Sequence, residues 1–262
     1  MTQVLSRLRR EHGLHRYRCA TLLSDSEYQL LQTDVPAVAA AELKEALRWK
    51  VKDVLDFPSD AATLDAVELP SAGPGRPAQM LVAAAPNSVI AARMKDFDDA
   101  RVPLDVIDIP ELAQRNLASL FEEPNRGLGL LTFDENGGLL TFSCAGALYA
   151  SRRTDIGTSQ LAGADEGRRT QLLDRLTLEL QRTLDTLDRQ FSSITVSRVL
   201  VAETEGGPVL THLTANLYAA VERLDLARVM DLDAVPELME SARQPQALVA
   251  IGLALRREEP ET

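Results

Sequence analysis

The sequence predicts an α/β protein, because strand-like and helix-like segments alternate along most of its 262 residues. Three observations support this prediction. The composition is 45% hydrophobic and 26% charged, which suits one large or two modest globular domains. Residues 62–70 alternate apolar and polar side chains with the period of a strand, and residues 165–191 repeat leucines with the period of a helix.

The first part of the chain is predicted to form a small α/β subdomain. Residues 17–25 and 27–34 are expected to be neighbouring strands that pair across a polar turn. Further strands are predicted at 62–70, 78–86 and 102–109, and helices at 3–11, from Glu42, at 88–100 and from Pro110. Asn87 is the expected N-cap of the helix at 88–100. The subdomain is predicted to span Gly13 to Ala100 within a first domain at 1–104, which leaves 105–262 as the second domain.

The second part is predicted to contain a three-stranded antiparallel meander at 127–157 and then a long helix. The turn "ENGG" is expected to close the first hairpin, with Gly137 at positive φ. Leucines at three- and four-residue spacing predict a helix from Asp165 to Phe191 with one buried face. The remaining predicted elements are a strand at 196–203, a glycine turn, a helix at 209–222, a short strand at 224–230 and an apolar helix at 244–256.

The charge balance and the cysteine count limit the class of partner. A net charge of −11 disfavours a nonspecific grip of the whole surface on nucleic acid or anionic lipid, and leaves room only for a local basic patch. Cys19 and Cys144 are far apart and form no C-x-x-C pair. No apolar run approaches the ~18–20 residues of a transmembrane helix. We therefore expect a cytoplasmic protein that reaches a membrane only through a partner.

Candidate metal and acid–base residues are few. His12 and His15 have H-x-x-H spacing with Cys19 nearby, but a polar helix end explains them equally, and no metal site is predicted. His212 stands alone on a predicted helix and is expected to be a surface or capping residue. The carboxylates at 105 and 108 are interpreted as the solvated face of a short strand rather than as a catalytic pair.

No motif indicates an enzyme class. The sequence holds no G-x-S-x-G elbow, H-E-x-x-H helix or G-x-x-x-x-G-K-[ST] loop. The glycines of "GLGLL" precede a predicted strand, whereas those of a dinucleotide fingerprint follow one. We therefore predict no enzymatic activity and no catalytic residue.

The single tryptophan, Trp49, lies on the unexpected side of its predicted helix. At 100° per residue, one apolar stripe is formed by Leu43, Leu47, Val51, Val54 and Leu55. Trp49 falls near the opposite side. Two explanations stay open: the indole is buried under a neighbouring subdomain, or it lines a groove that binds a partner.

The segment around this tryptophan resembles a family signature. "AELKEALRWKVKDVLDFP" matches the pattern E-L-x-x-A-[IL]-x-W followed by a phenylalanine–proline pair, which is typical of the actin-like pilus-assembly proteins of the PilM family. The matching positions are Glu42, Leu43, Ala46, Leu47, Trp49, Phe57 and Pro58. Further segments in family order are "MLVAAAPNSVIAARMKDFDDARV", "VIDIPELAQRNL", "LELQRTLDTLDRQF" and "ALVAIGLALR". The resemblance covers most of the chain, and "LELQRTLDTLDRQF" is most similar to the branch serving mannose-sensitive haemagglutinin (MSHA) pili, the MshI proteins.

The resemblance implies an actin-like α/β fold of the ASKHA/FtsA type, which holds nucleotide between two phosphate hairpins and a glycine pair near the adenosine. This chain begins with a predicted helix, so the N-terminal phosphate hairpin is expected to be missing, either through a start upstream of residue 1 or through loss of that lobe. Residual nucleotide-site positions are implied at Asp134, Gly137 and Gly138, and at Gly206 and Gly207. The hydroxyl residues that help to cradle phosphate are absent from "FDENGG", and a strand-to-helix turn explains the second glycine pair equally.

By this resemblance the chain is expected to be an actin-like scaffold or adaptor of an MSHA-type pilus or a secretion platform, without ATPase activity, bound cofactor or metal. It would bind the cytoplasmic N-terminal tail of a PilN-like inner-membrane protein, with Trp49 as a candidate contact. Neither nucleic-acid binding nor direct insertion into the membrane is expected. An acidic adaptor favours a tail with apolar and basic residues. The alternative is an ATP-binding switch or ATPase that uses Mg-ATP and whose first phosphate loop lies outside this sequence.

Overall fold

The computed structural model divides the chain into two compact units, Met1–Pro110 and Glu111–Thr262. It describes residues 1–71, 73, 75–191, 194–203, 207–240 and 242–256. The boundary predicted between residues 104 and 105 falls inside strand β5 (Leu104–Asp108), and the division between the units comes after that strand. Each unit is described separately below.

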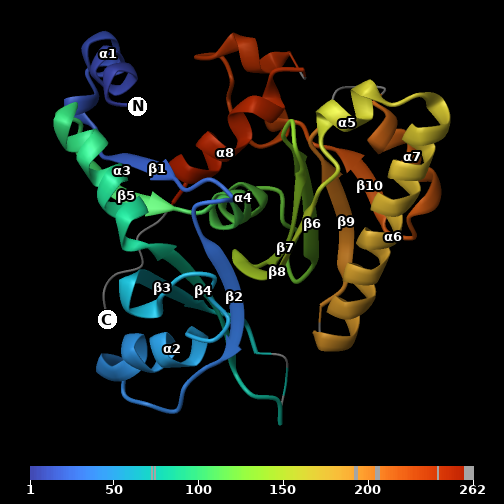
Figure 1. Ribbon diagram of the computed structural model, residues 1–262. Coiled ribbons are helices and arrows are strands. Elements are labelled where there is room, and N and C mark those ends of the chain that lie inside the picture. Colours follow the sequence, from blue (N-terminus) through green and yellow to red (C-terminus); the bar gives the residue numbers. More distant parts are fainter. Residues whose placement is uncertain (72, 74, 192–193, 204–206, 241, 257–262) are drawn as a thin grey trace. The chain divides into compact units, whose positions relative to one another are not determined.

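Unit 1 is built around a two-stranded and a three-stranded sheet (Figure 1). Its helices are α1 (Thr2–His12), α2 (Leu43–Val51) and α3 (Asn87–Asp99). Its strands are β1 (Cys19–Leu22), β2 (Gln29–Asp34), β3 (Ala62–Glu68), β4 (Gln79–Pro86) and β5. The predicted leading helix, the strands at 62–70 and 78–86 and the strand at 102–109 are therefore confirmed.

The predicted pairing of the first two strands is wrong. β1 pairs in parallel with β5, with Cys19 opposite Leu104, whereas β2 runs antiparallel to β4. The turn after β1 thus carries the chain from one sheet to the other instead of closing a hairpin. The predicted subdomain from Gly13 to Ala100 rested on that pairing and has to be redrawn as two layers, one around β1 and β5 and one around β2, β4 and β3.

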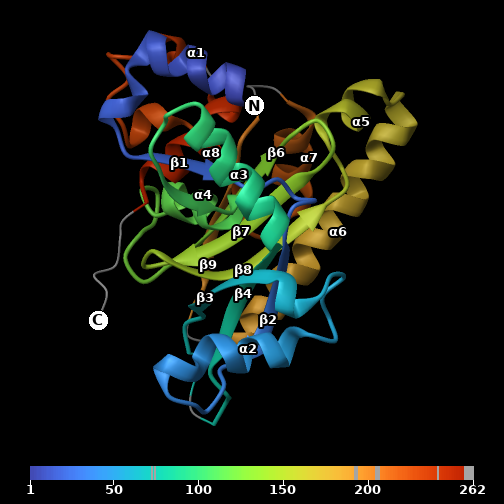
Figure 2. The ribbon, with the colours of Figure 1, turned by 60° about the vertical axis from the view of Figure 1, so that its left-hand side comes forward.

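Each sheet of unit 1 has its own helical cover (Figure 2). The three-stranded sheet packs on α2 through a core formed by Leu47, Val51, Ala62, Leu64, Met80, Val82 and Ala84. A separate small core forms where α3 and the chain beyond it meet β1, α1 and β5, and it consists of Phe97, Ala100 and Val102 with Leu5, Leu14, Cys19 and Leu104 at its edge. The helix α1 ends at Gly13, whose φ of 66° is the left-handed conformation that glycine adopts without strain.

Two local predictions in unit 1 are wrong. Asn87 is the first residue of α3 and not its N-cap, and its side chain accepts a hydrogen bond from Thr63 Oγ1 at 2.8 Å. Asp108 is only 4% exposed, and its Oδ1 accepts the Ile109 N–H at 2.8 Å. Asp105 is exposed as predicted and pairs with Arg18 Nε at 2.6 Å. The interpretation of a solvated strand face therefore holds only for Asp105.

Unit 2 is a five-stranded sheet in the order β10-β9-β6-β7-β8 with helices on both faces (Figure 1). Its strands are β6 (Gly127–Phe133), β7 (Gly138–Cys144), β8 (Ala147–Thr154), β9 (Val196–Val201) and β10 (Ala220–Arg223). Its helices are α4 (Pro110–Ala118, which begins at the boundary), α5 (Thr158–Gly163), α6 (Glu166–Gln190), α7 (Pro208–Asn216) and α8 (Gln244–Ala254). Because β7 is buried along its whole length, the sheet is a central layer.

The meander and the long helix are confirmed, and two predictions further along are wrong. The β6-β7-β8 strands pair antiparallel, and α6 begins after Asp165, which accepts the Arg168 N–H at 2.8 Å. The helix predicted at 209–222 ends at Asn216, and its last residues form β10, which pairs in parallel with β9. The strand predicted at 224–230 contains instead a short 3-10 turn at Leu226–Arg228.

Candidate functional site

The predicted residual nucleotide-site positions lie at one edge of the unit 2 sheet. Strands β6 and β9 are parallel neighbours, with Leu131 opposite Val201, so the loops that follow them leave the sheet at the same edge. The carboxyl ends of parallel strands are where open α/β sheets bind ligands. The loop after β6 carries Asp134, and the loop after β9 leads to Gly207. Gly206 lies outside the described residues.

The hairpin after β6 is closed by its own aspartate. Asp134 Oδ1 accepts hydrogen bonds from the backbone N–H groups of Asn136 at 2.7 Å and Gly137 at 2.8 Å. The Asp134 N–H in turn donates to the Gly137 carbonyl at 2.9 Å. In a phosphate-binding turn, such amides point at phosphate oxygens. Here a carboxylate of the same loop takes that place.

Close packing explains the glycines of this hairpin. Gly137 is not among the glycines with positive φ, so that prediction is wrong. A Cβ on Gly137 would lie 2.6 Å from the Thr154 carbonyl oxygen, and one on Gly138 would lie 2.9 Å from the Phe133 ring. Neither distance is tolerable for a side-chain carbon. Glycine is required because the neighbouring β8 end and the Phe133 ring approach so closely.

A further loop lies directly against the hairpin. The Thr158 N–H and Oγ1 both donate to the Asp134 carbonyl, at 2.9 and 3.0 Å. The Ser159 N–H donates to the Glu135 carbonyl at 3.2 Å. A side chain on Gly157 would overlap the backbone of Glu135. The start of α5 therefore covers the hairpin where a ligand phosphate would have to approach.

The N-terminus of α7 is occupied in the same way. The Glu203 carboxylate accepts the Val209 N–H at 3.2 Å and the Leu210 N–H at 2.7 Å. Burial raises the pKa of this carboxyl, and the two backbone hydrogen bonds offset the effect only in part. A Cβ on Gly207 would overlap the Glu203 side chain, so the glycine makes room for the carboxylate. The helix N-terminus, a natural anion site, is already hydrogen-bonded to a carboxyl group of the chain.

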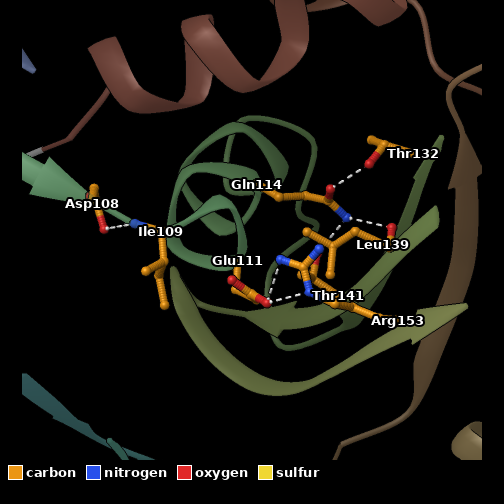
Figure 3. A network of polar contacts seen from close by, with 8 residues as sticks. All are labelled: Asp108, Ile109, Glu111, Gln114, Thr132, Leu139, Thr141 and Arg153. Carbon is orange, nitrogen blue, oxygen red and sulfur yellow. Dashed lines mark hydrogen bonds and ion pairs between the residues drawn. The ribbon is translucent and has the colours of Figure 1, made fainter. Parts of the chain in front are cut away.

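A buried polar network ties α4 to the sheet beneath this edge (Figure 3). Gln114 is 2% exposed, and its Nε2 donates to the carbonyls of Leu130 at 2.6 Å and Leu139 at 3.0 Å. Its Oε1 accepts the Thr132 hydroxyl at 2.7 Å. Because both ends of the amide are bonded within the protein, Gln114 fixes α4 against β6 and β7 rather than presenting a group to a ligand.

An ion pair between buried Glu111 of α4 and partly exposed Arg153 of β8 also ties this helix to the sheet. Glu111 is 2% exposed, and its Oε1 accepts hydrogen bonds from Arg153 Nε at 3.1 Å and Nη2 at 2.9 Å (Figure 3). The sequence predicted a helix from Pro110 but did not single out Glu111 or Gln114 as buried polar residues. Glu111 and Gln114 are three positions apart and therefore share one face of the helix, which is otherwise apolar. This spacing could have indicated two buried polar side chains.

The second candidate site is the outer face of α2 in unit 1. Trp49 is 71% exposed, and Lys52 Nζ lies 5.1 Å from the centroid of its ring, within cation–π range. Unit 1 itself therefore does not bury the indole. The buried side of the helix is formed by Leu47 and Val51, as the stripe predicts, but Val54 lies beyond the end of α2 and is 59% exposed.

The family-like residues around Trp49 have structural contacts of their own. Leu43 and Phe57 pack at the edge of the core between α2 and the sheet. Arg48 Nη1 donates to the carbonyls of Ser59 and of Ala62, the latter at 2.9 Å, which fastens the loop after α2 to the helix. Trp49 stands out because its indole is left exposed on a helix that is otherwise fixed.

The histidines show no metal chemistry. Among the described residues, no group of three or more histidine, cysteine, aspartate or glutamate side chains is placed to hold a metal ion. His12 and His15 are exposed, and Cys19 packs at the edge of the small core of α3. His212 Nε2 lies 3.1 Å from Asp174 Oδ1 on α6, a contact between helices rather than a helix cap.

The comparisons with known proteins show the fold. No protein-family model matches this chain, and no curated protein does. Among solved structures, the chain is similar to a PilM-PilN type IV pilus biogenesis complex, at 23% identity with a TM-score of 0.74, over 97% of this chain and 84% of that one. It is also similar to the cytoplasmic domain of EpsL, an inner-membrane component of the type II secretion system of Vibrio cholerae, at 11% identity with a TM-score of 0.53, over 98% and 82%. The predicted actin-like α/β fold is confirmed.

Proposed function

We propose that this chain is a non-enzymatic actin-like adaptor of a type IV pilus assembly platform of the MSHA type, related to the MshI branch of PilM-like proteins. It binds the cytoplasmic N-terminal tail of a PilN-like inner-membrane protein, and is cytoplasmic and peripheral at the inner membrane through that partner. The similarity in fold to a PilM-PilN complex supports the class of partner. Within the described residues, no helix combines the length and the apolar character of a membrane span.

The observation that carries the non-enzymatic part of the proposal is the pair of carboxylates at the edge of β6 and β9. Asp134 bonds to the amides of its hairpin, and Glu203 bonds to the amides at the start of α7. A nucleotide phosphate would have to displace two side-chain carboxyl groups that are already hydrogen-bonded to these backbone amides. This edge therefore disfavours Mg-ATP, and we assign the residual positions a structural role.

The outer face of α2 supports the binding part of the proposal. Tryptophan is enriched at the energetic centres of protein interfaces, and Trp49 is presented on a helix fixed by the core of unit 1. A tail with an apolar residue to cover the indole and with basic residues suits an acidic adaptor. Trp49 is the residue that we propose as the anchor of this contact.

The test is a titration of the protein with synthetic N-terminal tails of PilN-like proteins. Trp49 is the only tryptophan of the chain, so its fluorescence reports directly on the proposed contact. We expect saturable binding with a blue shift of the emission, and no response to a scrambled peptide of the same composition. Absence of saturable binding, measured also with a dye-labelled peptide to detect binding elsewhere, would contradict the adaptor function.

A further inference from the structure

The first residues of the chain have a positive net charge, whereas the rest of the chain has a negative one. Residues 1–18 contain five arginines against one glutamate, a formal net charge of +4. Because the whole chain has a net charge of −11, residues 19–262 carry −15. A basic segment in an otherwise acidic protein is a common signature of an arm that meets a polyanionic surface.

Three of these arginines are not neutralised by the chain's own acids. Arg7 and Arg10 on α1 and Arg16 just after it are exposed, and none of them makes an ion pair with any residue that the structure describes. Arg18, by contrast, pairs with Asp105. The sequence contains 39 acidic residues, so acidic partners are plentiful. Intramolecular ion pairs therefore do not account for the three arginines.

Apolar side chains are exposed beside these arginines. Val4 is 51% exposed and Tyr17 is 62% exposed, whereas Leu5 of α1 packs on the small core of α3. We name Val4, Arg7, Arg10, Arg16 and Tyr17 the basic surface. Arginines together with an exposed aromatic ring and an aliphatic side chain suit the interface of an anionic bilayer, where the charges meet headgroups and Tyr17 lies at the boundary with the acyl chains.

The basic surface and the outer face of α2, which carries Trp49, lie at opposite ends of unit 1. Both views show α1 beside α3 at one end, and α2 against the three-stranded sheet at the other (Figure 1, Figure 2). The acidic groups close to α1 include Glu11 on the helix itself and Asp96 on α3, which accepts a hydrogen bond from Thr2 Oγ1 at 2.5 Å. A flat bilayer can meet the exposed arginines of α1 at this end of unit 1 without covering α2. Because residues 19–262 carry −15, a polyanion that contacts more of the chain than α1 is disfavoured.

We propose that the basic surface binds a membrane that carries anionic headgroups, by adsorption and without insertion. Each arginine near such a surface strengthens binding by roughly fivefold, so loss of all three should weaken it by about 100-fold. Binding through this surface alone is weak, reversible and sensitive to salt. It is independent of the proposed tail contact, and it would add a second point of attachment that raises the apparent affinity for a membrane-bound partner.

The experiment is co-sedimentation of the full chain with phosphatidylglycerol–phosphatidylcholine vesicles, compared with phosphatidylcholine alone. We expect binding only to the anionic vesicles, and its loss when the salt is raised to several hundred millimolar, because screening removes the attraction. The variant R7Q/R10Q/R16Q should lose about 100-fold in vesicle affinity, and R7K/R10K/R16K should retain binding. Thermal midpoints of both variants should match the unchanged protein, since the three side chains are exposed.

A matched control removes three exposed positive charges elsewhere. Lys44, Arg152 and Arg182 lie on α2, β8 and α6, and the variant K44Q/R152Q/R182Q should sediment as the unchanged protein does. The proposal is overturned if the unchanged chain ignores anionic vesicles, or if the two triple variants lose binding equally. Tighter binding to duplex DNA than to the vesicles at the same salt concentration would also overturn it, as would self-association that R7Q/R10Q/R16Q abolishes.

Discussion

The carboxyl edge of β6 and β9 in unit 2 and the outer face of α2 in unit 1 present opposite chemistry to a ligand. At the first, the backbone amides that could hold an anion are bonded to Asp134 and Glu203. At the second, a large aromatic side chain is left in solvent with only Lys52 over its ring. The carboxyl edge of a sheet, where α/β folds usually bind ligands, is here occupied by side chains of the chain itself, whereas the outer face of α2 leaves an aromatic side chain exposed.

The glycines of the first region illustrate the same difference. Gly137, Gly138 and Gly207 stand where the resemblance places nucleotide contacts, yet each is explained by the close approach of a neighbouring part of the protein. The glycines alone are therefore no evidence of nucleotide binding, because close packing accounts for each of them.

The largest expected effect is on the core beneath Trp49. Leu47 is 2% exposed between α2 and its sheet, so Leu47→Ala should lower the free energy of unfolding by about 2–5 kcal/mol. Trp49→Ala, two residues away, should change it by no more than about 0.5 kcal/mol because the indole is exposed. Chemical denaturation of both variants measures the difference. A loss of several kcal/mol in Trp49→Ala would show that the indole is part of the core after all.

Trp49→Ala should instead weaken the tail contact. We expect a loss of about 2 kcal/mol or more in binding free energy, roughly 30-fold in Kd, measured by anisotropy of a dye-labelled tail peptide. The matched control is Tyr218→Ala in unit 2, which removes another exposed aromatic ring, 63% exposed, and should leave Kd unchanged. Equal affinities of Trp49→Ala and the unchanged protein would leave the proposed anchor without support.

Gly207→Ala tests the packing of Glu203 against the α7 N-terminus. The added Cβ overlaps the Glu203 side chain, so the carboxylate has to leave the Val209 and Leu210 amides, at a cost of about 1–3 kcal/mol in unfolding free energy. The same substitution made in a Glu203→Ala background should cost less, because the overlap is gone. If the losses in unfolding free energy from the two substitutions are additive, the glycine at 207 is not needed to make room for the Glu203 side chain.

Glu203 in unit 2 and Glu27 in unit 1 should make the free energy of unfolding depend on pH in opposite directions. Burial raises the pKa of Glu203, so the folded state holds this proton more tightly, and its contribution to stability is lost as pH rises through the raised pKa. The Ser24 N–H bond and Arg93 lower the pKa of Glu27, so its contribution is present above the ordinary glutamate pKa and is lost as pH falls through the lowered one.

Glu203→Gln and Glu27→Gln separate these contributions when denaturation is measured from acidic to neutral pH. Relative to the unchanged protein, Glu203→Gln should gain stability as pH rises, and Glu27→Gln should lose it. The effects are smaller than the preceding ones. Parallel pH profiles for both variants and the unchanged protein would contradict the assigned causes.

The sequence predicted those elements whose partners are local. The spacing of its leucines predicted the α6 helix, and a glycine turn between two apolar runs predicted the β6-β7 hairpin. The β1-β5 pairing could not be predicted, because Cys19 meets Leu104, a partner far along the chain, and a nearby strand offered a simpler hairpin. The segment 217–223 is short and mostly apolar, so its hydrophobic pattern does not distinguish a helix from a strand.

The candidate sites were predicted in position but not in chemistry. The angle of Trp49 on its helix placed the indole off the apolar stripe, but the spacing could not decide between burial under a neighbouring subdomain and exposure in a groove. Asp134 and Glu203 accept hydrogen bonds from backbone N–H groups. These bonds depend on the path of the backbone and on where each side chain can reach, and the spacing of residues in the sequence gives neither. Glu203 lies six positions before Val209, whereas a capping residue normally stands next to the first helical turn.

The central claim is that the carboxyl edge of β6 and β9 is closed to nucleotide phosphate by the chain's own carboxylates. Isothermal titration calorimetry of the full chain with Mg-ATP tests it most directly, since binding is measured without assuming hydrolysis. The account predicts no heat beyond that of dilution at millimolar nucleotide. Saturable binding of Mg-ATP at micromolar Kd would contradict it, and would favour the nucleotide-dependent switch over the adaptor.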